Sequence, residues 1–366
     1  MKKNVNGVLR SKKGFVVGIA LGLSQFAAVQ VHADWTSSVF ATGAALGATG
    51  PDSITFGAGS LWVSYAGGTT ADGSQPAGFS TVVRYAFDGA VQHTYSIAGS
   101  VDGLKFNPYT GDVWALQNQD ANSSLTLINP TTNETTSKPY AVVSNSQGYD
   151  DVVFKGAQTF LSYTNPAVAT DVTIRLTTPG TSPIAVTDIL TAGATGTNLN
   201  TGATNQPLPS FPGDPDSLKL APNGDLVQTS GNRDALIFVH DAGLASQSVS
   251  FLQLTKTGGG AVTGLDDSIY ATARSGTFYL TETGANNVLA IHATGLRIGD
   301  LYGAVGSEHA LEQIDPTTGL LTPVLTGLIG PHGIAFVPEV PEPETYALML
   351  AGLGLVGLIA RRRKTA

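Results

Sequence analysis

A six-residue motif recurs along the chain and constrains the fold more than any other feature. Each copy combines a turn residue, an Asp or His, a small or acidic residue, and alternating apolar residues. The copies are PDSITF, VDGLKF, YDDVVF, PDSLKL, DDSIYA and PHGIAF, with key residues Asp52, Asp102, Asp150, Asp216, Asp267 and His332. These key residues are 50, 48, 66, 51 and 65 positions apart. An internal repeat of this length indicates a ring or array of similar units.

Each repeat reads as several short antiparallel strands. A second apolar segment follows five of the motifs after a turn, and four of these segments carry an aromatic residue: Trp62, Trp114, Phe160 and Tyr279. Third and fourth alternating segments come next, such as TVVRYAF and VQHTYSIA. Four strands in about 50 residues predict one blade of a β-propeller, because packing the blades around an axis covers both faces of each sheet.

The number of strand segments favours six blades, with seven as the alternative. One segment precedes Pro51, sixteen fill four repeats and seven lie between Ile269 and Pro338, which makes 24. The strand around Val39 to Ala41 must then complete a blade that the end of the chain begins. We therefore predict an all-β propeller over residues 34–338, closed by its first and last strands.

Two segments carry a resemblance to known propellers. GTFYLTETGANNVLAI (276–291) and IDPTTG (314–319) resemble the blades of NHL, YncE-like and streptogramin-lyase-like proteins. The resemblance covers the repeat consensus only. It implies a scaffold that serves binding, scaffolding, lactonase and lyase functions, so it does not choose among them.

The first 33 residues have the order of a secretory signal peptide. Five basic residues precede an apolar run from Phe15 to Val31, and VHA then places small residues before the predicted cut between Ala33 and Asp34. The alternative is an uncut N-terminal anchor. We predict a signal helix over residues 1–33 and export of the body. The chain has no cysteine, so burial alone stabilises the exported fold.

The last residues form a spacer, a short apolar helix and a basic end. Residues 339–345 are rich in Pro and Glu, and residues 346–360 are apolar. As a helix this run spans about 22 Å, short of the ~30 Å hydrocarbon core. The basic tail should remain on the cytoplasmic side of the inner membrane; it comprises Arg361, Arg362, Arg363 and Lys364.

This terminus resembles the PEP-CTERM sorting signal of Gram-negative bacteria, and the alternative is an ordinary C-terminal anchor. The hallmark triplet is Pro341, Glu342 and Pro343, followed by the apolar stretch and the Arg run over residues 346–366. The resemblance implies an exosortase as partner, which cleaves near the triplet. It also implies transient anchoring in the inner membrane, then placement at the cell surface or in the extracellular matrix, with a link to exopolysaccharide and biofilm.

The charge balance restricts the partners of the body. The signal holds five of the 19 basic residues and the tail four, so ten remain against all 27 acids. A body with a formal charge of about −17 repels nucleic acid and anionic lipid. Cations and neutral sugars are better suited as partners of this acidic body.

The six key residues are the candidate site. They occupy one position in each blade, so they should converge on the axis. Several close carboxylates favour a hard cation such as Ca²⁺; the other interpretation is that each Asp caps its local turn. The doublets Asp150-Asp151 and Asp266-Asp267 leave the register open by one residue. Glu282 and His309 could join His332 at the mouth, but their spacing does not require it.

The sequence therefore predicts an exported binding or interaction protein, with matrix polysaccharide or another envelope protein as partner. No catalytic residue and no certain cofactor is assigned. The alternative is a metal-assisted lactonase- or lyase-like enzyme on the same scaffold. Converging carboxylates with an open coordination site would favour the enzyme, and a channel filled by apolar side chains would favour the binding protein.

Overall fold

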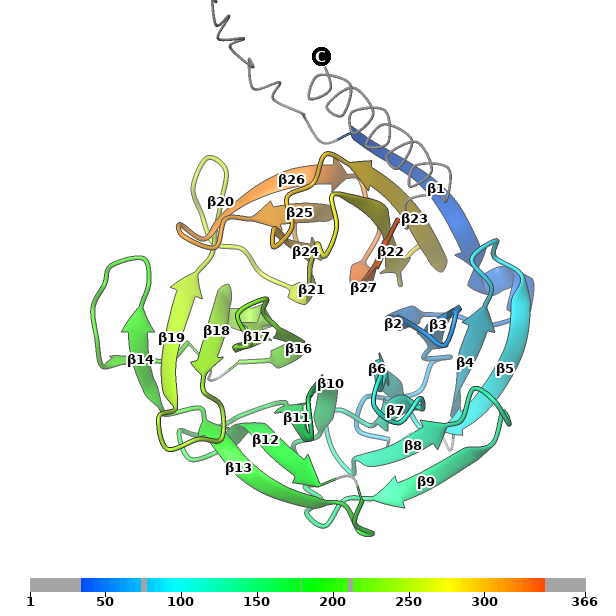
Figure 1. Cartoon of the computed structure of the whole chain (residues 1–366), viewed down its shortest axis with the longest axis horizontal. Helices are drawn as coiled ribbons and strands as arrows, with labels where there is room; N and C mark the ends of the chain where they lie inside the picture. Colours follow the sequence, from blue (N-terminus) through cyan, green and yellow to red (C-terminus); the bar gives the residue numbers. More distant parts are fainter. Residues whose placement is uncertain (1–33, 74–77, 179, 210–212, 340–366) are drawn as a thin grey trace, which may run out of the picture. The chain divides into compact units, whose positions relative to one another are not determined.

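The computed structural model describes residues 34–73, 78–178, 180–209 and 213–339. Six sheets hold the 27 strands of these residues, and each sheet contains one four-stranded blade (Figure 1). The six-bladed propeller predicted from the repeat is confirmed. The predicted signal helix (1–33) and C-terminal helix (346–366) lie outside the described residues. Within the described ranges, no helix has the length and apolar character needed to cross a membrane.

The first four blades each use four consecutive antiparallel strands, which run from the axis outward. Blade 1 comprises β2 (Pro51–Gly57), β3 (Ser60–Tyr65), β4 (Phe79–Tyr85) and β5 (Val91–Ala98). Blade 2 comprises β6 (Val101–Phe106), β7 (Val113–Gln117), β8 (Ser124–Ile128) and β9 (Thr135–Pro139). Blade 3 comprises β10 (Tyr149–Lys155), β11 (Gln158–Tyr163), β12 (Val172–Thr178) and β13 (Ala185–Thr191). Blade 4 comprises β16 (Pro215–Leu220), β17 (Leu226–Ser230), β18 (Ala235–His240) and β19 (Ser248–Gln253).

The last two blades exchange strands. Blade 5 comprises β21 (Leu265–Tyr270), β24 (Leu301–Val305), β25 (Ala310–Ile314) and β26 (Leu320–Thr326). Blade 6 comprises β27 (Pro331–Pro338), β22 (Ser275–Glu282), β23 (Asn287–Thr294) and β1 (Asp34–Thr42). After β21 the chain therefore enters blade 6, returns to blade 5 for three strands and crosses again to form β27.

This exchange corrects one expectation. The sequence pattern predicts that DDSIYA and TFYLTE form a hairpin, as the equivalent segments do in the first four blades. Instead, Tyr279 of β22 pairs with Ala335 of β27, and Ile269 of β21 pairs with Tyr302 of β24. Both arrangements satisfy the local alternation of apolar residues, so only the packing of the whole chain distinguishes them.

The first strand closes the propeller, as predicted. β1 pairs antiparallel with β23, from Asp34 opposite Thr294 to Thr42 opposite Asn287. It is the outermost strand of the blade whose innermost strand, β27, ends the propeller. Trp35 lies with its ring centroid 5.4 Å from that of Phe278. The two ends of the body are therefore joined by a sheet and not by a covalent bond.

The hydrophobic core lies between neighbouring blades. The aromatic residues of the second strands are almost fully buried there: Trp62 is 0% exposed, Trp114 2%, Phe160 0% and Tyr279 6%. They therefore pack the blades against one another.

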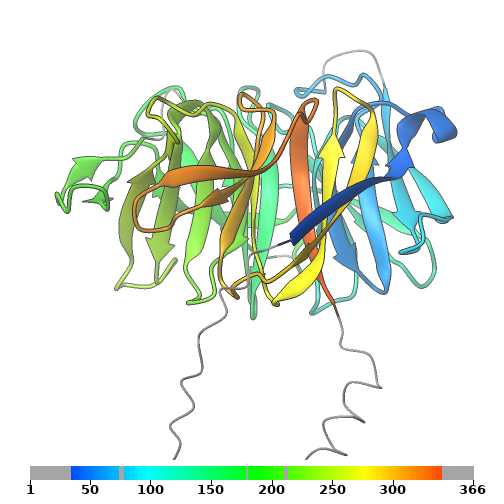
Figure 2. The ribbon, with the colours of Figure 1, turned by 90° about the horizontal axis from the view of Figure 1, so that it is seen from above.

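Three short strands and two 3₁₀ turns lie outside the blades. β14 (Thr195–Asn198) pairs in parallel with β19 and forms a hairpin with β15 (Gln206–Pro207). This hairpin projects from the side of the propeller, in green at the left of Figure 2. The remaining elements are β20 (Thr255–Lys256), η1 (Gly43–Leu46) and η2 (Gly231–Arg233).

Candidate functional site

The innermost strand of every blade bends at the same place. In blade 1, β2 pairs with β3 at Pro51 and next at Ile54, so the register shifts across Asp52 and Ser53. The corresponding shift occurs in all six blades. A β-bulge redirects side chains and is frequent beside functional sites. Here it turns two consecutive residues per blade toward the axis.

The first residues of the bulges form what we call the axial ring: Asp52, Asp102, Asp150, Asp216, Asp266 and His332. The second residues form the second layer: Ser53, Gly103, Asp151, Ser217, Asp267 and Gly333. Five of the six key residues of the repeat therefore lie in the axial ring. The structure places Asp266 there in place of Asp267, because Leu265 and Ser268 are the paired residues of β21.

The axial ring has two parts: the two carboxylates that His332 contacts, and the three that it does not. Its Nδ1 lies 3.2 Å from a carboxylate oxygen of Asp52 and 3.2 Å from one of Asp266. The charge of Asp266, supported by Asp52, raises the pKa of His332 to about 12 although burial opposes it. His332 is therefore an imidazolium at neutral pH and partly compensates two of the five carboxylates.

The other three carboxylates form a cluster on adjacent blades. Asp102, Asp150 and Asp216 each offer one carboxylate oxygen, and these oxygens lie within 4.8 Å of one another. Burial raises the pKa of Asp150 well above its usual range, and the charges of Asp216 and Asp102 raise it further. Burial, followed by the charge of Asp266, does the same for Asp216. The cluster must therefore bind protons or a cation to be stable.

A cavity of about 410 Å³ opens above the axial ring. Its wall is formed by the six ring residues and by connecting segments between strands, including Thr69, Asn165 and Asp214. Burial and nearby carboxylates, Asp120 first among them, raise the pKa of Asp214 to about 6. A solute can therefore reach the three clustered carboxylates through a mouth that is itself acidic.

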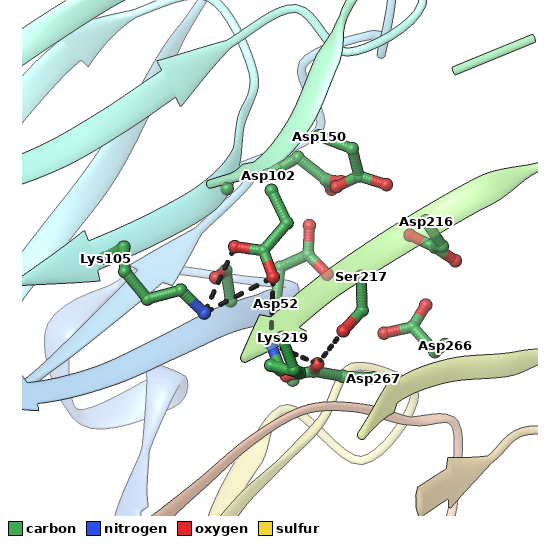
Figure 3. Close-up of a pocket in the computed structure, with 13 residues that line it drawn as sticks. Asp52, Asp102, Lys105, Asp150, Asp216, Ser217, Lys219, Asp266 and Asp267 are labelled. Carbon is green, nitrogen blue, oxygen red and sulfur yellow. Dashed lines mark hydrogen bonds and ion pairs between the residues drawn. The ribbon is translucent and has the colours of Figure 1, made fainter. Parts of the chain in front are cut away.

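Buried ion pairs form the floor of the mouth (Figure 3). Lys219 Nζ lies 2.8 Å from Asp151 and 2.6 Å from Asp267, and Lys105 Nζ lies 3.1 Å from Asp151. Burial raises the pKa of Asp151, but the two lysines outweigh it and hold that pKa below its usual range. Charged side chains therefore fill the channel beneath the cavity, in place of the apolar side chains expected for a binding protein. The carboxylates that converge below the open cavity correspond to the arrangement expected for the enzyme.

Residues of the second layer also join neighbouring blades. Asp151 accepts a hydrogen bond from Leu218 N at 3.0 Å, and Asp267 accepts one from Ile334 N at 3.0 Å. Ser53 Oγ accepts one from Leu104 N at 2.9 Å. Within the described part of the chain, no axial-ring carboxylate accepts a hydrogen bond from a backbone N–H. In blades 1, 3 and 5, backbone N–H groups are therefore capped by the second residue of the bulge, and the ring carboxylates face the cavity.

The two lysines were not predicted, although the sequence contains a signal for them. VDGLKF and PDSLKL are the two repeats with Lys at the fifth position, Lys105 and Lys219. A Lys in an amphipathic strand usually reaches solvent. In a propeller the innermost strand is covered on both faces, so a Lys at this position has to find a buried carboxylate.

Glu282 and His309 do not join His332. Glu282 accepts a hydrogen bond from Ile329 N at 2.9 Å, and His309 Nδ1 lies 3.1 Å from Leu328 O. Both side chains therefore hold the connection between β26 and β27. The acid–base arrangement considered from the sequence is not formed by these contacts.

A Ser–His–Asp arrangement occurs elsewhere, on blade 4. His240 Nδ1 lies 2.7 Å from Asp225 Oδ2, and His240 Nε2 lies 2.9 Å from Ser250 Oγ. Ser250 is only 5% exposed, which shields its hydroxyl from a substrate. We interpret these contacts as a link between the turn before β17 and the two outer strands of the blade.

Comparison with known proteins identifies the C-terminus. Residues 339–364 match the PEP-CTERM protein-sorting motif. The body itself is a six-bladed β-propeller. No curated protein matches the chain.

Solved structures with a similar fold share little sequence with this chain. Virginiamycin B lyase from Staphylococcus aureus is 12% identical, with 85% of this chain and 76% of that chain covered and a TM-score of 0.42. A streptogramin B lyase is 13% identical, with coverages of 82% and 94% and a TM-score of 0.48. A candidate gluconolactonase is 12% identical, with coverages of 81% and 83% and a TM-score of 0.45. Likenesses at this level do not assign an activity.

Proposed function

We propose that this chain is an exported propeller that binds Ca²⁺ at its acidic mouth and acts as a non-enzymatic binding protein in the extracellular matrix. The observation that carries the proposal is the cluster of Asp102, Asp150 and Asp216, whose carboxylate oxygens lie within 4.8 Å of one another. Carboxylate oxygens are the ligands that Ca²⁺ prefers, and the site also leaves room for oxygens of water or of a bound partner.

The fit to Ca²⁺ is supported by the charge of the donor set. Asp102, Asp150 and Asp216 provide three acidic groups, while the imidazolium of His332 lies between Asp52 and Asp266. The set contains no soft sulfur ligand, because the chain has no cysteine. A hard divalent cation is therefore favoured over zinc or copper.

The PEP-CTERM motif implies recognition by an exosortase, and we propose two cuts during sorting. Signal peptidase should release the N-terminus at Asp34, and the tail should be lost near Pro341 to Glu344. Mass spectrometry of both termini of the protein from its host measures this. Mature protein that still carries Arg361 to Lys364 would argue against processing by an exosortase.

Replacing Arg361, Arg362 and Arg363 by Ala should weaken membrane retention before cleavage.

Millimolar Ca²⁺ should raise the Tm of the chelator-treated full-length chain by about 5 °C, because a ligand that binds only the folded state stabilises it. The paired substitution Asp102→Asn and Asp216→Asn should abolish this rise. Asp34→Asn with Asp241→Asn removes the same charge from exposed sites and should leave the rise intact. Calorimetry that detects no Ca²⁺ binding to the unmodified chain would refute the cation site.

The same experiment has a predicted pH dependence. The pKa values of Asp150 and Asp216 are raised in the folded state, whereas unfolded Asp titrates near pH 3.9. Between these values the folded state binds more protons, so the stability of the Ca²⁺-free protein falls as pH rises. Bound Ca²⁺ replaces those protons, and its stabilising effect should therefore be larger at pH 8 than at pH 5. A stabilising effect of Ca²⁺ that is the same at pH 5 and pH 8 would contradict this assignment.

A metal-assisted lactonase or lyase is the second candidate, because the carboxylates converge beneath an open cavity. Such an enzyme also needs a group that accepts or donates a proton near neutral pH. Asp214, in the wall of the same cavity, has its pKa raised to about 6 and meets this requirement, whereas Asp266 raises the pKa of His332 to about 12. The cation site is common to both candidates, and the binding protein is the one that requires no further group. Ca²⁺-dependent hydrolysis of an aldonolactone that is lost in Asp102→Asn would favour the enzyme instead.

A further inference from the structure

The interface between blade 6 and blade 1 differs from the other blade interfaces in its outer part. The outermost strand of blade 1, β5, contributes the buried apolar side chains Tyr95 and Ile97 to the core shared with blade 2. The outermost strand of blade 6 is β1, and it places Thr36 and Ser38 at the side facing blade 1. Hydroxyl side chains cannot fill this space as apolar ones do, and a groove of about 520 Å³ remains.

The floor of this groove is a row of short polar side chains across three strands. Thr277 of β22 lies opposite His292 of β23, which lies opposite Thr36 of β1. In the next row, Ala290 lies opposite Ser38. These positions alternate with Trp35, which packs on the other face of the sheet against Phe278. The polar side chains therefore line the face of the sheet toward the groove, and the aromatic contact of Trp35 lies on the opposite face.

Aromatic rings form the wall of the groove. Phe87 comes from the turn between β4 and β5 and is 43% exposed, with its ring centroid 6.5 Å from that of Tyr279. Phe40 lies 5.0 Å from Tyr279 by the same measure. The turn approaches β1 closely at Gly89, where φ is 87° and a Cβ atom would lie 3.0 Å from Phe40 O. A glycine at this position lets the turn bring Phe87 against the groove.

The charges of the lining select the class of ligand. Among the described residues, the groove is lined by one carboxylate, Asp88, by the imidazole of His292, and by no Lys or Arg. It therefore offers no guanidinium or ammonium group to pair with a phosphate, sulfate or uronate, and too few acids to hold a cation. An exposed aromatic ring beside several hydroxyls suits a ligand with apolar C–H faces and many hydroxyl groups. The volume lies within the usual range for a small-molecule pocket.

We propose that the groove between blades 6 and 1 binds an uncharged saccharide, which stacks on Phe87 and hydrogen-bonds to Thr36, Thr277, His292 and Asp88. This is a second site, separate from the acidic mouth. It depends on the proposed function only for its extracellular setting. It gives the protein a means of holding neutral polysaccharide chains that is independent of bound Ca²⁺.

The test is calorimetry of the full-length chain, in a detergent without a sugar headgroup, with cellohexaose, maltohexaose and mannohexaose as probes. At least one hexasaccharide should bind. Phe87→Ala should weaken that binding about tenfold, because the stacking surface is lost. Thr277→Val keeps the shape, removes one hydroxyl and should also weaken it. Phe79→Ala is the matched control, since Phe79 is 59% exposed and does not line the groove.

The results separate this proposal from the cation site. Saccharide binding should persist in the Asp102→Asn, Asp216→Asn variant and in the presence of chelator. Failure of all three hexasaccharides to bind would overturn the proposal, as would equal weakening by Phe87→Ala and Phe79→Ala. Binding that requires Ca²⁺ would also overturn it, because the saccharide would then lie in the mouth. A Tm for Phe87→Ala equal to that of the unmodified chain verifies that the variant is folded.

Discussion

Deletion of residues 34–42 should lower the free energy of unfolding by about 5 kcal/mol and the Tm by about 10–20 °C. These residues form β1, which closes the propeller against β23. Trp35 would leave its contacts with Phe278 and Tyr302, and Phe40 its contacts with Tyr85 and Tyr279. Truncating a core aromatic residue costs about 3–5 kcal/mol, and both rings here are half-buried. The loss would be a large fraction of the whole stability of a domain.

Thermal and denaturant unfolding followed by circular dichroism measure this effect. The matched control replaces residues 201–204, an exposed part of the β14–β15 hairpin, by two glycines. That change also shortens a peripheral segment but leaves the closure intact, so it should have little effect. An unchanged Tm after deletion of β1 would show that the propeller does not depend on closure by its first strand.

Asp151→Ala should destabilise the fold by about 3–5 kcal/mol, because it leaves Lys105 without a counter-charge and Lys219 with only one of its two carboxylate partners. Asp151 is the only acid within 4 Å of Lys105 Nζ among the ion pairs of the described residues, and it shares Lys219 with Asp267. Guanidinium unfolding of the single variant measures the loss. Adding Lys105→Met should recover part of it, since the uncompensated charge is removed.

Asp188→Asn is the matched control for this prediction. Asp188 also pairs with a cation, Arg175, at 2.9 Å, but its side chain is 60% exposed. Pairs of this kind contribute about 1 kcal/mol or less. Equal effects of Asp151→Ala and Asp188→Asn would mean that the floor of the mouth is as well solvated as the surface, and that the buried network has no special role in stability.

The repeat predicts the architecture well because its spacing reports a property of the whole chain. Six motifs and 24 strand segments lead to six blades, and the unmatched first strand requires the closure that Val39 to Ala41 provide. The axial ring also follows, because equivalent positions of a propeller turn toward one axis. The doublet Asp266-Asp267 could not be resolved, since a shift by one residue preserves the motif. The register is fixed only by the pairing of Leu265 with Val305 and of Ser268 with Gly303, which leaves Asp266 as the first residue of the bulge.

Other features depend on contacts that no local pattern records. Tyr279 has the spacing of a hairpin partner for β21, yet it pairs with Ala335 inside the next blade, blade 6. The local sequence predicts that Lys105 and Lys219 face solvent. Because both faces of their strands are covered by neighbouring blades, they pair with Asp151 and Asp267 instead. The saccharide groove depends on Thr36 and Thr277, which are 241 residues apart and meet only through β23.

The exchange of strands between blades 5 and 6 limits how this gene can change its number of repeats. Excising residues 101–148 would remove one whole blade, since β6 to β9 are contiguous. No single cut between β21 and β27 does the same, because any blade-sized piece there takes strands from both sheets. Tandem duplication or loss can therefore act on the first four blades one at a time. The last two must be inherited together, so relatives with fewer or more blades should differ in the first part of the chain.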